Sequence, residues 1–293
     1  MTTTDSAALT ATLPIALPAR ADGNPLEHLS ATSLSCFWQC PEAFRRRYLL
    51  GERGPVSAEM LRGRVVDAAV SAYYRALLDR GCPPAASDSD EEIERAWRDE
   101  LDEPRDEIDW GDWQAAALKD SAVAALRAYL AQLAPTVQPV AVQRRFELRL
   151  NAALEWSIVG YVDLEDAAGD VIDLKVKRSH LTQPAADAHP QASLYLLERA
   201  LAGAPGRRFV FHSVCPTARE KVRAVATART RAQLQAHLAR VVATARAIDA
   251  LARQLGRDCP WPLADPASWK CSPRYCPHFA GCQGGLAGLP RAA

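Results

Sequence analysis

Hydrophobic and polar residues follow two different periods along this chain. Apolar residues recur every three or four positions up to about residue 134 and again after residue 228, which indicates amphipathic helices. Between these regions, short runs alternate apolar and polar residues, which is typical of strands. The expected helices span residues 57–80, 89–101, 113–133, 189–202 and 228–255. The expected strands span residues 139–150, 154–164, 170–177, 207–215 and 221–226.

An earlier helical segment, "SATSLSCFWQCPEAFRRRYLLG", covers residues 30–51. It begins with Ser and Thr residues that can cap a helix and ends on Gly51. Pro41 lies inside its apolar pattern, and proline interrupts helices. We therefore expect either one kinked helix or two short ones.

The order of these elements indicates the fold class. Helices come first, followed by a meander of strands, a further helix and more strands, which predicts an α/β or α+β core with a helical N-terminal lobe. The expected organisation is a flexible tail at 1–28, a main domain at 29–260 with its helical lobe at 57–134, a cysteine-rich segment at 261–285 that packs on the same domain, and a second tail at 286–293.

The composition limits the class of protein. With 293 residues, of which 48% are hydrophobic, the chain can bury a sizeable core. Its 35 basic and 35 acidic residues balance, so any contact with nucleic acid must come from a local basic patch rather than from the overall charge.

The sequence also bears on the compartment. No apolar run approaches the roughly 20 residues of a membrane span. The N-terminus lacks the basic stretch of a signal peptide, and Pro14 and Pro18 interrupt its apolar part. We therefore expect a cytoplasmic protein, in which thiols stay reduced. Its eight cysteines then indicate metal or cluster ligation before disulfides.

One expected hairpin, "GYVDLEDAAGDVIDLKVK" at residues 160–177, carries an unusual set of charges. Because side chains alternate along a strand, Asp173 and Lys175 point to the same face. Pairing of the two strands sets Asp163 close to Asp173, with Lys175 beside them. These charges fit either a catalytic cluster or the wet, charged face of a half-exposed hairpin.

Three further cysteines lie close together in "CSPRYCPHFAGC": Cys271, Cys276 and Cys282. Such a cluster needs a fourth ligand, which could be Cys40 or, one helical turn earlier, Cys36. A three-plus-one set fits an iron–sulfur cluster at least as well as zinc. If the nearby His278 were the fourth ligand, the site would hold zinc.

Six motifs occur in order over about residues 29–285: "SLSCFWQCPEAFRRRYL", "GRVVDAAVSAYY", "GYVDLED", "VIDLKVK", "QASLY" and the closing cysteines. In this order the chain resembles the RecB-like branch of the PD-(D/E)XK nucleases, especially the cluster-containing exonucleases of phages and CRISPR adaptation systems. That family has Gly-x-x-x-His, Gly-x-x-Asp, Asp/Glu-x-Lys and Gln-x-x-x-Tyr in the four middle positions. Two features depart from it, because Asp67 stands where histidine is usual and the first two clustered cysteines have C-x4-C rather than C-x2-C spacing.

The resemblance implies a restriction-endonuclease-like core, with a central mixed sheet flanked by helices and the cysteine cluster as a C-terminal staple. It implies a metal-dependent DNA exonuclease that hydrolyses phosphodiester bonds at single-stranded or duplex ends, in recombination or repair, phage DNA processing or CRISPR adaptation. Asp163, Asp173 and Lys175 would be the catalytic residues. Gln191 and Tyr195, one helical turn apart, would order the site or contact the substrate backbone.

The resemblance also implies two kinds of cofactor. Mg²⁺ or Mn²⁺, which prefer hard oxygen ligands, would be held by Asp67, Asp163, Asp173 and the backbone carbonyl of Leu174. A [4Fe–4S] cluster would be held by Cys40, Cys271, Cys276 and Cys282, with structural Zn²⁺ as the alternative. The expected partners are DNA and proteins of recombination or CRISPR adaptation, and no membrane.

Two other functions fit the same residues. A catalytically impaired DNA-binding or assembly subunit would keep the fold and the cluster, and Asp67 in place of histidine favours it. The intact set of Asp163, Asp173 and Lys175 favours the nuclease instead. A zinc-stabilised regulatory domain, in which the hairpin charges are incidental, is the third reading.

Overall fold

The computed structural model describes residues 15–102, 107–151, 154–204 and 206–282. The chain divides into two compact units, each built from separated parts of the sequence. The first unit comprises residues 1–54, 147–160 and 231–293, and the second comprises residues 55–146 and 161–230. Of the expected tails, residues 1–14 and 286–293 lie outside the described residues, as do residues 283–285 of the cysteine-rich segment.

A mixed sheet forms the centre of the second unit. Its strands are β4 (Pro139–Leu148), β5 (Ser157–Asp166), β6 (Val171–Val176), β7 (Phe209–Val214) and β8 (Val222–Thr227), of which β4 and β5 extend into the first unit. The order is β5-β6-β7-β8, and β4 pairs with β5. Strands β6 and β7 are parallel, whereas the β5–β6 and β7–β8 pairs are antiparallel.

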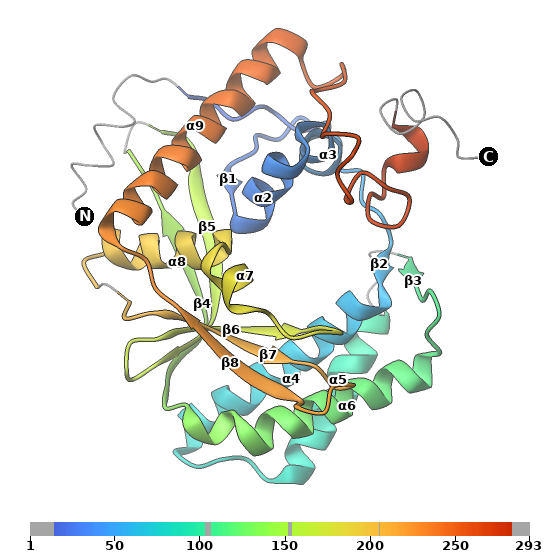
Figure 1. Cartoon of the computed structure of the whole chain (residues 1–293), viewed down its shortest axis with the longest axis vertical. Helices are drawn as coiled ribbons and strands as arrows, with labels where there is room; N and C mark the ends of the chain where they lie inside the picture. The colour runs from blue at the N-terminus through green and yellow to red at the C-terminus, as the bar shows by residue number, and fades with distance from the viewer. Residues whose placement is uncertain (1–14, 103–106, 152–153, 205, 283–293) are drawn as a thin grey trace. The chain divides into compact units, whose positions relative to one another are not determined.

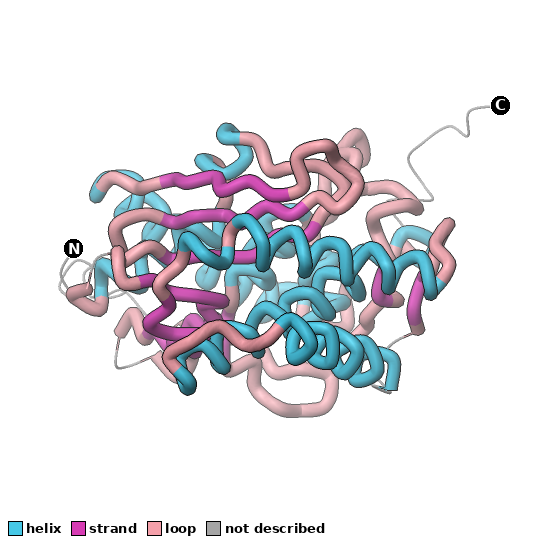
Figure 2. The backbone as a smooth tube through the Cα atoms, turned by 90° about the horizontal axis from the view of Figure 1, so that it is seen from below, coloured by secondary structure: helices cyan, strands magenta, loops and turns pink. Residues whose placement is uncertain are grey.

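Helices cover both faces of this sheet. On one side, α4 (Ala58–Arg80), α5 (Ala86–Asp102) and α6 (Ala115–Gln132) pack together (Figure 1), and helices lie across the strands in the orthogonal view (Figure 2). Tyr129 of α6 contacts His212 of β7, whereas Tyr195 of α8 (Pro190–Leu201) contacts Phe209. Positions three apart on a strand face opposite sides, so α6 and α8 cover opposite faces. All six residues of β7 are accordingly buried.

Helix α4 illustrates how the local sequence sets an element's ends. The side chain of Ser57 accepts a hydrogen bond from the N–H of Met60, which caps the first turn. Gly81 ends the helix with φ of 70°, a left-handed conformation that glycine adopts without steric cost. Between these ends, the buried face of α4 places Val66 and Val70 in the core and carries Asp67 beside them.

The first unit combines the start of the chain with its last segments. It contains β1 (His28–Leu29), α2 (Ala31–Gln39), α3 (Pro41–Phe44), the π-helical turn η1 (Arg45–Leu49), α9 (Arg231–Leu255) and the 3₁₀ turn η3 (Phe279–Gly281). β1 pairs in parallel with the first residues of β5. Trp38 of α2 donates a hydrogen bond from its indole to Thr244 of α9 at 2.7 Å. This contact joins residues that are far apart in the sequence.

The long elements agree with the hydrophobic pattern to within a few residues. Pro41 separates two helices, and Cys40 between them is extended, with φ of −161°. Besides the 3₁₀ turns η2 (Ala134–Thr136) and η3, four short elements in the described ranges were not expected: β1, the paired strands β2 (Val56–Ser57) and β3 (Ile108–Asp109), and α7 (Gln183–Asp187). Residues 15–28, assigned to a tail from the sequence, contribute Ile15 and Leu26 to the buried core. None of the helices in the described ranges is both long and apolar enough to cross a bilayer.

Candidate active site and cysteine cluster

The two aspartates of the charged hairpin meet where β5 and β6 separate. Backbone pairing of these strands includes Leu164 with Ile172, a register that sets Asp163 opposite Asp173. Oδ2 of Asp163 accepts a hydrogen bond from the N–H of Leu174 at 3.0 Å. The side chain therefore satisfies a backbone donor at the point where the strands diverge.

Lys175 lies against Asp173 rather than in solvent. Its Nζ is 2.6 Å from Oδ2 of Asp173 and donates to Oε1 of Gln191 at 3.0 Å. Nε2 of Gln191 donates in turn to Oδ1 of Asp173 at 2.5 Å. The Asp173 side chain is only 3% exposed and the Lys175 side chain 22% exposed. The three side chains thus form a closed, largely buried ring of contacts, unlike the wet, charged face that was the alternative.

Asp67 approaches the same region from α4. The side-chain amide of Gln143 on β4 donates to Oδ2 of Asp67 at 3.2 Å and to Oγ of Ser71 at 3.0 Å. Gln143 has φ of 49°, a left-handed conformation that it shares with no other non-glycine residue in the described ranges. Such a conformation costs a non-glycine residue about 1–2 kcal/mol. A strained backbone position therefore directs an amide donor onto the Asp67 carboxylate.

Gln143 is the one residue of this arrangement that the sequence did not reveal. Its contact with Asp67 joins positions 76 residues apart. A single Gln in a strand forms no recognisable motif, and its backbone conformation cannot be predicted from one sequence.

Burial and mutual repulsion make it unfavourable for all three carboxyl groups to be ionised together. Burial and the charge of Asp173 raise the pKa of Asp67 to about 6. Burial, Asp173 and Asp67 raise the pKa of Asp163 well above its usual range. Burial opposes the charge of Lys175, but the carboxylates of Asp173, Asp163 and Asp67 outweigh it and raise the pKa of the ammonium. One ammonium does not balance three carboxylates, so a cation would relieve the repulsion.

The oxygen atoms at this site are of the type that a hard divalent cation prefers as ligands. A cavity of about 10 Å³, room for roughly one water-sized particle, lies against Asp67, Asp163 and Leu174; the rest of its lining is mostly apolar, and Asp173 does not line it. Oδ2 of Asp173 is contacted by the ammonium of Lys175 at 2.6 Å, so this oxygen could bind a cation only if that contact rearranged. The N–H and C=O of a strand residue face the same neighbouring strand, so the Leu174 carbonyl also points toward β5. Carboxylate and carbonyl oxygens are the ligands that Mg²⁺ and Mn²⁺ prefer.

Across the described ranges, no group of three or more His, Cys, Asp or Glu side chains is arranged to hold a metal ion. At the carboxylate site the oxygens instead contact the Leu174 N–H, Gln143, Gln191 and Lys175. Some of these contacts must rearrange before all three carboxylates can face one ion.

Tyr195 fastens α8 to the sheet beside this ring. Its hydroxyl donates to the backbone oxygen of Tyr161 at 2.9 Å, and its ring packs edge-on against Phe146 and Phe209. Burial raises the pKa of Tyr195 to about 12, so the hydroxyl keeps its proton at neutral pH. Through α8, this anchor also sets the position of Gln191, one helical turn earlier.

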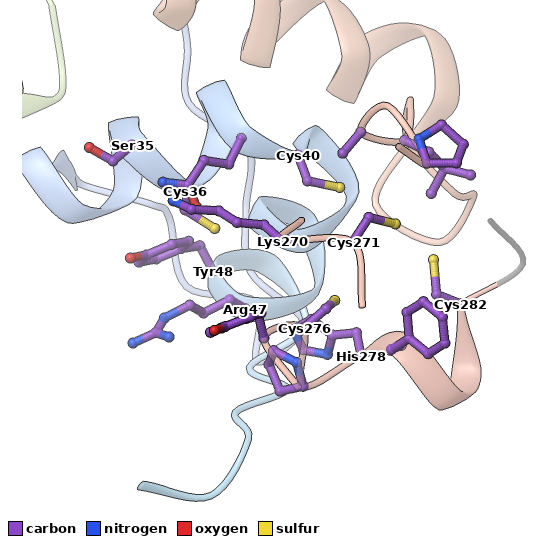
Figure 3. Close-up of a pocket in the computed structure, with 18 of the residues that line it drawn as sticks. Ser35, Cys36, Cys40, Arg47, Tyr48, Lys270, Cys271, Cys276, His278 and Cys282 are labelled. Carbon is purple, nitrogen blue, oxygen red and sulfur yellow. The ribbon is translucent and has the colours of Figure 1, made fainter. Parts of the chain in front are cut away.

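In the first unit, five cysteines line one cavity of about 290 Å³: Cys36, Cys40, Cys271, Cys276 and Cys282. Figure 3 shows the sulfur atoms of the last four around a common space: Cys40 comes from between α2 and α3, and the other three come from the C-terminal segment. The pKa of Cys276 is raised by burial and also by the charges of Cys40, Cys282 and Cys271. The pKa of Cys271 is likewise raised by burial, Cys282 and Cys40. Cys271 and Cys276 therefore lie close enough to the other thiols of the set for their own pKa values to respond.

Cys36 and His278 lie at the same cavity but differ from these four. Burial is the largest cause that raises the pKa of Cys36, to about 11, and among the other thiols only Cys40 and Cys276 add to it. Nδ1 of His278 lies 3.7 Å from Oε2 of Glu52, outside the cysteine set. Both are candidates for a fourth ligand, but the charge of Cys40, and not that of Cys36, is among the causes that raise the pKa of Cys271 and Cys276.

Comparisons with known proteins address the fold and family. The model of the family described as the PD-(D/E)XK nuclease superfamily matches residues 28–283. No curated protein sequence matches the chain. A solved structure of a candidate exonuclease from Eubacterium rectale is similar to it with a TM-score of 0.52 and 14% identity, over 84% of this chain and 87% of that one. The protein SSO0001 is matched at a TM-score of 0.34 and 12% identity, over 87% of this chain and 96% of that one, which is too weak a likeness to inform the fold.

Proposed function

The chain belongs to the PD-(D/E)XK nuclease superfamily, and from this premise we propose that it is a metal-dependent DNA exonuclease that hydrolyses phosphodiester bonds at single-stranded or duplex ends. One observation carries the proposal. Three crowded carboxylates and a single ammonium, Lys175, lie together where β5 and β6 separate, and burial and repulsion raise the pKa of Asp67 to about 6. Such an arrangement is unfavourable unless a cation and an anionic substrate use it.

The proposed roles follow from the donor types. Asp67, Asp163, Asp173 and the Leu174 carbonyl would hold Mg²⁺ or Mn²⁺. When bound, such an ion supplies positive charge to the phosphoryl oxygens and lowers the pKa of water. Lys175, whose raised pKa keeps it protonated, would orient the attacking water and offset the charge that develops on the phosphate.

Gln191 and Tyr195 would order the site. Gln191 contacts both Lys175 and Asp173, so it sets the separation of the ammonium from the carboxylate. The hydroxyl of Tyr195 already donates a hydrogen bond to the backbone oxygen of Tyr161. We therefore assign Tyr195 a positioning role through α8 and leave direct contact with substrate to Gln191.

The cysteine cavity would hold a [4Fe–4S] cluster through Cys40, Cys271, Cys276 and Cys282, with a structural role. The lining of one cavity by Cys40, between α2 and α3, and by three thiols of the C-terminal segment supports this ligand set. Structural Zn²⁺, with His278 as a possible ligand, is the alternative. The biological setting that we propose is the cytoplasm, in DNA recombination or repair, phage DNA processing or CRISPR adaptation, with protein partners from those processes.

A second candidate function is a catalytically impaired DNA-binding or assembly subunit of the same fold. The observation that favours it is Asp67, which stands where the resembling family has histidine and is held by Gln143. Comparison of Asp67→His with Asp67→Ala separates the two functions. In an active nuclease, Asp67→Ala greatly weakens cleavage, whereas Asp67→His retains it and favours Mn²⁺, because imidazole suits softer ions than Mg²⁺.

The direct test is digestion of end-labelled single-stranded and duplex DNA by protein purified without oxygen, with Mg²⁺ or Mn²⁺ supplied in turn. We expect shortening from the labelled ends that requires the metal and is abolished in Asp173→Asn. Asp249→Asn, which removes a carboxylate of α9 in the first unit, serves as the matched control and should cleave like the natural protein. DNA binding without cleavage under every metal condition would support the impaired subunit instead.

A further inference from the structure

Two aromatic side chains of the cysteine-rich segment are unusually exposed. Trp269 is 63% exposed, more than any other large hydrophobic side chain in the described ranges, and Tyr275 is 52% exposed. Their rings meet edge to face, with centroids 4.8 Å apart and planes at 90°. Each ring therefore presents aromatic surface to solvent, and the two form one continuous patch. Exposed aromatic surface of this kind marks an interaction site.

The backbone around these rings is held by a series of turns. The hydroxyl of Ser272 donates to the backbone oxygen of Trp269 at 2.8 Å, and the N–H of Tyr275 donates to the oxygen of Ser272 at 3.1 Å. Both aromatic positions are thus tied to the same serine. These contacts fix the backbone that carries the rings, and the edge-to-face contact restrains the two side chains, which reduces the conformational entropy lost when a ligand binds.

Each exposed ring also has a cation over it, which a stacking base would displace toward the neighbouring phosphate. Nζ of Lys270 lies 5.1 Å from the ring centroid of Trp269, and Cζ of Arg274 lies 5.4 Å from that of Tyr275. Lys270 and Tyr275 also line the cysteine cavity, whose lining includes Arg47 but neither aspartate nor glutamate. The patch therefore combines flat apolar surfaces with positive charge in a protein whose net charge is zero. This chemistry complements a ligand that has both aromatic faces and negative charges.

We propose that Trp269, Lys270, Arg274 and Tyr275, here called the aromatic platform, bind single-stranded DNA. Unpaired bases would stack on the two rings while the cations contact the adjacent phosphates, a combination that binds single strands without sequence preference. Duplex DNA keeps its base faces stacked inside the helix, so it offers the platform its phosphates alone. The proposal involves none of the residues assigned to hydrolysis and does not require that the protein cleave DNA.

The test measures binding of fluorescent oligothymidine to the full chain by anisotropy, with Ca²⁺ in place of a catalytic metal. Replacing both rings in Trp269→Ala/Tyr275→Ala should weaken binding at least about tenfold, given the usual contribution of base–aromatic stacking. Binding of a blunt hairpin duplex should change little. Leu255→Ala removes another exposed apolar side chain of the same unit and serves as the matched control, with affinity unchanged.

Two further measurements separate stacking from charge. An oligonucleotide of abasic sites has phosphates but no bases, so the double variant and the natural protein should bind it equally. Lys270→Ala/Arg274→Ala should instead lower the slope of log affinity against log salt by about 1.4, since each phosphate contact on a single strand contributes about 0.7. Equal melting temperatures and equal iron or zinc contents establish that each variant is folded. If the double alanine variant does not fold, the single variants Trp269→Leu and Tyr275→Leu, which keep an apolar side chain but lose a ring, provide the same comparison.

Several results would overturn the proposal. The proposal is wrong if the folded double variant binds oligothymidine as tightly as the natural protein does. It is also wrong if the variant loses as much affinity for the abasic strand as for oligothymidine. Trp, Tyr and Arg are also enriched at protein interfaces. An oligomer that dissociates in the variant while DNA binding persists would therefore assign the patch to a protein partner. If the protein binds DNA through the platform but does not cleave it, the binding proposal holds and the proposed nuclease function is wrong.

Discussion

Lys175 and Lys177 lie two positions apart in the sequence but have different surroundings. Lys175 contacts Asp173 and Gln191, whereas Lys177 follows the end of β6 and is exposed. Strand geometry separates the two by roughly 7 Å. The ammonium of Lys175 therefore belongs to the carboxylate site, whereas Lys177 lies on the exposed surface outside it.

We predict opposite effects for the two alanine variants. Lys175→Ala should lower the single-turnover cleavage rate by at least about a hundredfold, the scale for loss of a positioned catalytic group, with DNA affinity in Ca²⁺ nearly unchanged. Lys177→Ala should weaken DNA binding modestly and reduce its salt dependence, with little change in the saturated rate. Rapid-quench kinetics and anisotropy measure the two quantities. Equal, small effects in two folded variants would contradict the catalytic assignment.

Gln143 permits a test that separates backbone strain from metal positioning. Gln143→Gly loses the amide that holds Asp67 but relieves the cost of φ at 49°. Gln143→Ala loses the amide and keeps the strain. We expect both variants to bind Mn²⁺ several-fold more weakly by calorimetry, and only the alanine variant to melt clearly below the natural protein. Undiminished Mn²⁺ binding in both would show that Gln143 has no effect on the metal site.

At the scale of elements, α3 is joined to the C-terminal segment by a buried carboxylate. Glu42, 2% exposed, accepts hydrogen bonds from Arg45 and Arg46 and, at 2.8 Å, from the N–H of Trp261. Burial opposes the charge of Glu42, but these hydrogen bonds from Arg45, Trp261 and Arg46 outweigh it and lower its pKa. A lowered pKa of an acid means that the ionised carboxylate stabilises the folded state.

We predict that Glu42→Gln destabilises the protein in a pH-dependent way. At pH 7 the loss should be about 3 kcal/mol, the scale for removing one partner of a buried ion pair. The contribution of Glu42 is present above the ordinary glutamate pKa of 4.5 and is lost as the pH falls through its lowered value in the fold. The difference from the natural protein, measured by urea unfolding, should therefore shrink below about pH 4.5. Glu52→Gln, whose 45% exposed side chain pairs with Arg46 at 3.3 Å, is the control and should cost less than about 1 kcal/mol.

The accuracy of the element predictions depended on length. Long helices such as α4 and α9 repeat their apolar pattern over many turns, so the period identifies them. β1, β2 and β3 have two residues each, too few for any period, and they exist because a distant strand pairs with them. The break between α2 and α3 was predictable because proline acts locally.

At the scale of the whole molecule, the cysteine cavity joins the beginning of the chain to its end. Ligation of one cluster by Cys40 and Cys271 would close a loop of about 230 residues, and long loops have the largest nominal entropic benefit from closure. We predict that protein purified without oxygen contains iron and acid-labile sulfide. Replacing any one of the four proposed ligands by serine should lower the iron content and the folding yield: Cys40, Cys271, Cys276 and Cys282.

Two control variants sharpen this prediction. Cys215→Ser should leave the iron content unchanged, because that thiol is buried in the second unit and contacts the backbone oxygen of Arg178. Cys36→Ser should also retain iron if Cys40 is the fourth ligand. Loss of iron in Cys36→Ser but not in Cys40→Ser would show that Cys36 is the fourth ligand. Stoichiometric zinc without iron would show that the site holds zinc rather than an iron–sulfur cluster.

The sequence by itself determined the order and type of the long elements, the family motifs and the placement of Asp163 opposite Asp173. These follow from short-range rules, because periodicity and strand alternation act over a few residues. Only the tertiary structure decided that Gln143 holds Asp67, that the Asp173 carboxylate is buried with Lys175 and Gln191, and that Cys40 faces the C-terminal thiols. Burial and contacts between distant positions arise when the chain packs, and no local pattern encodes them.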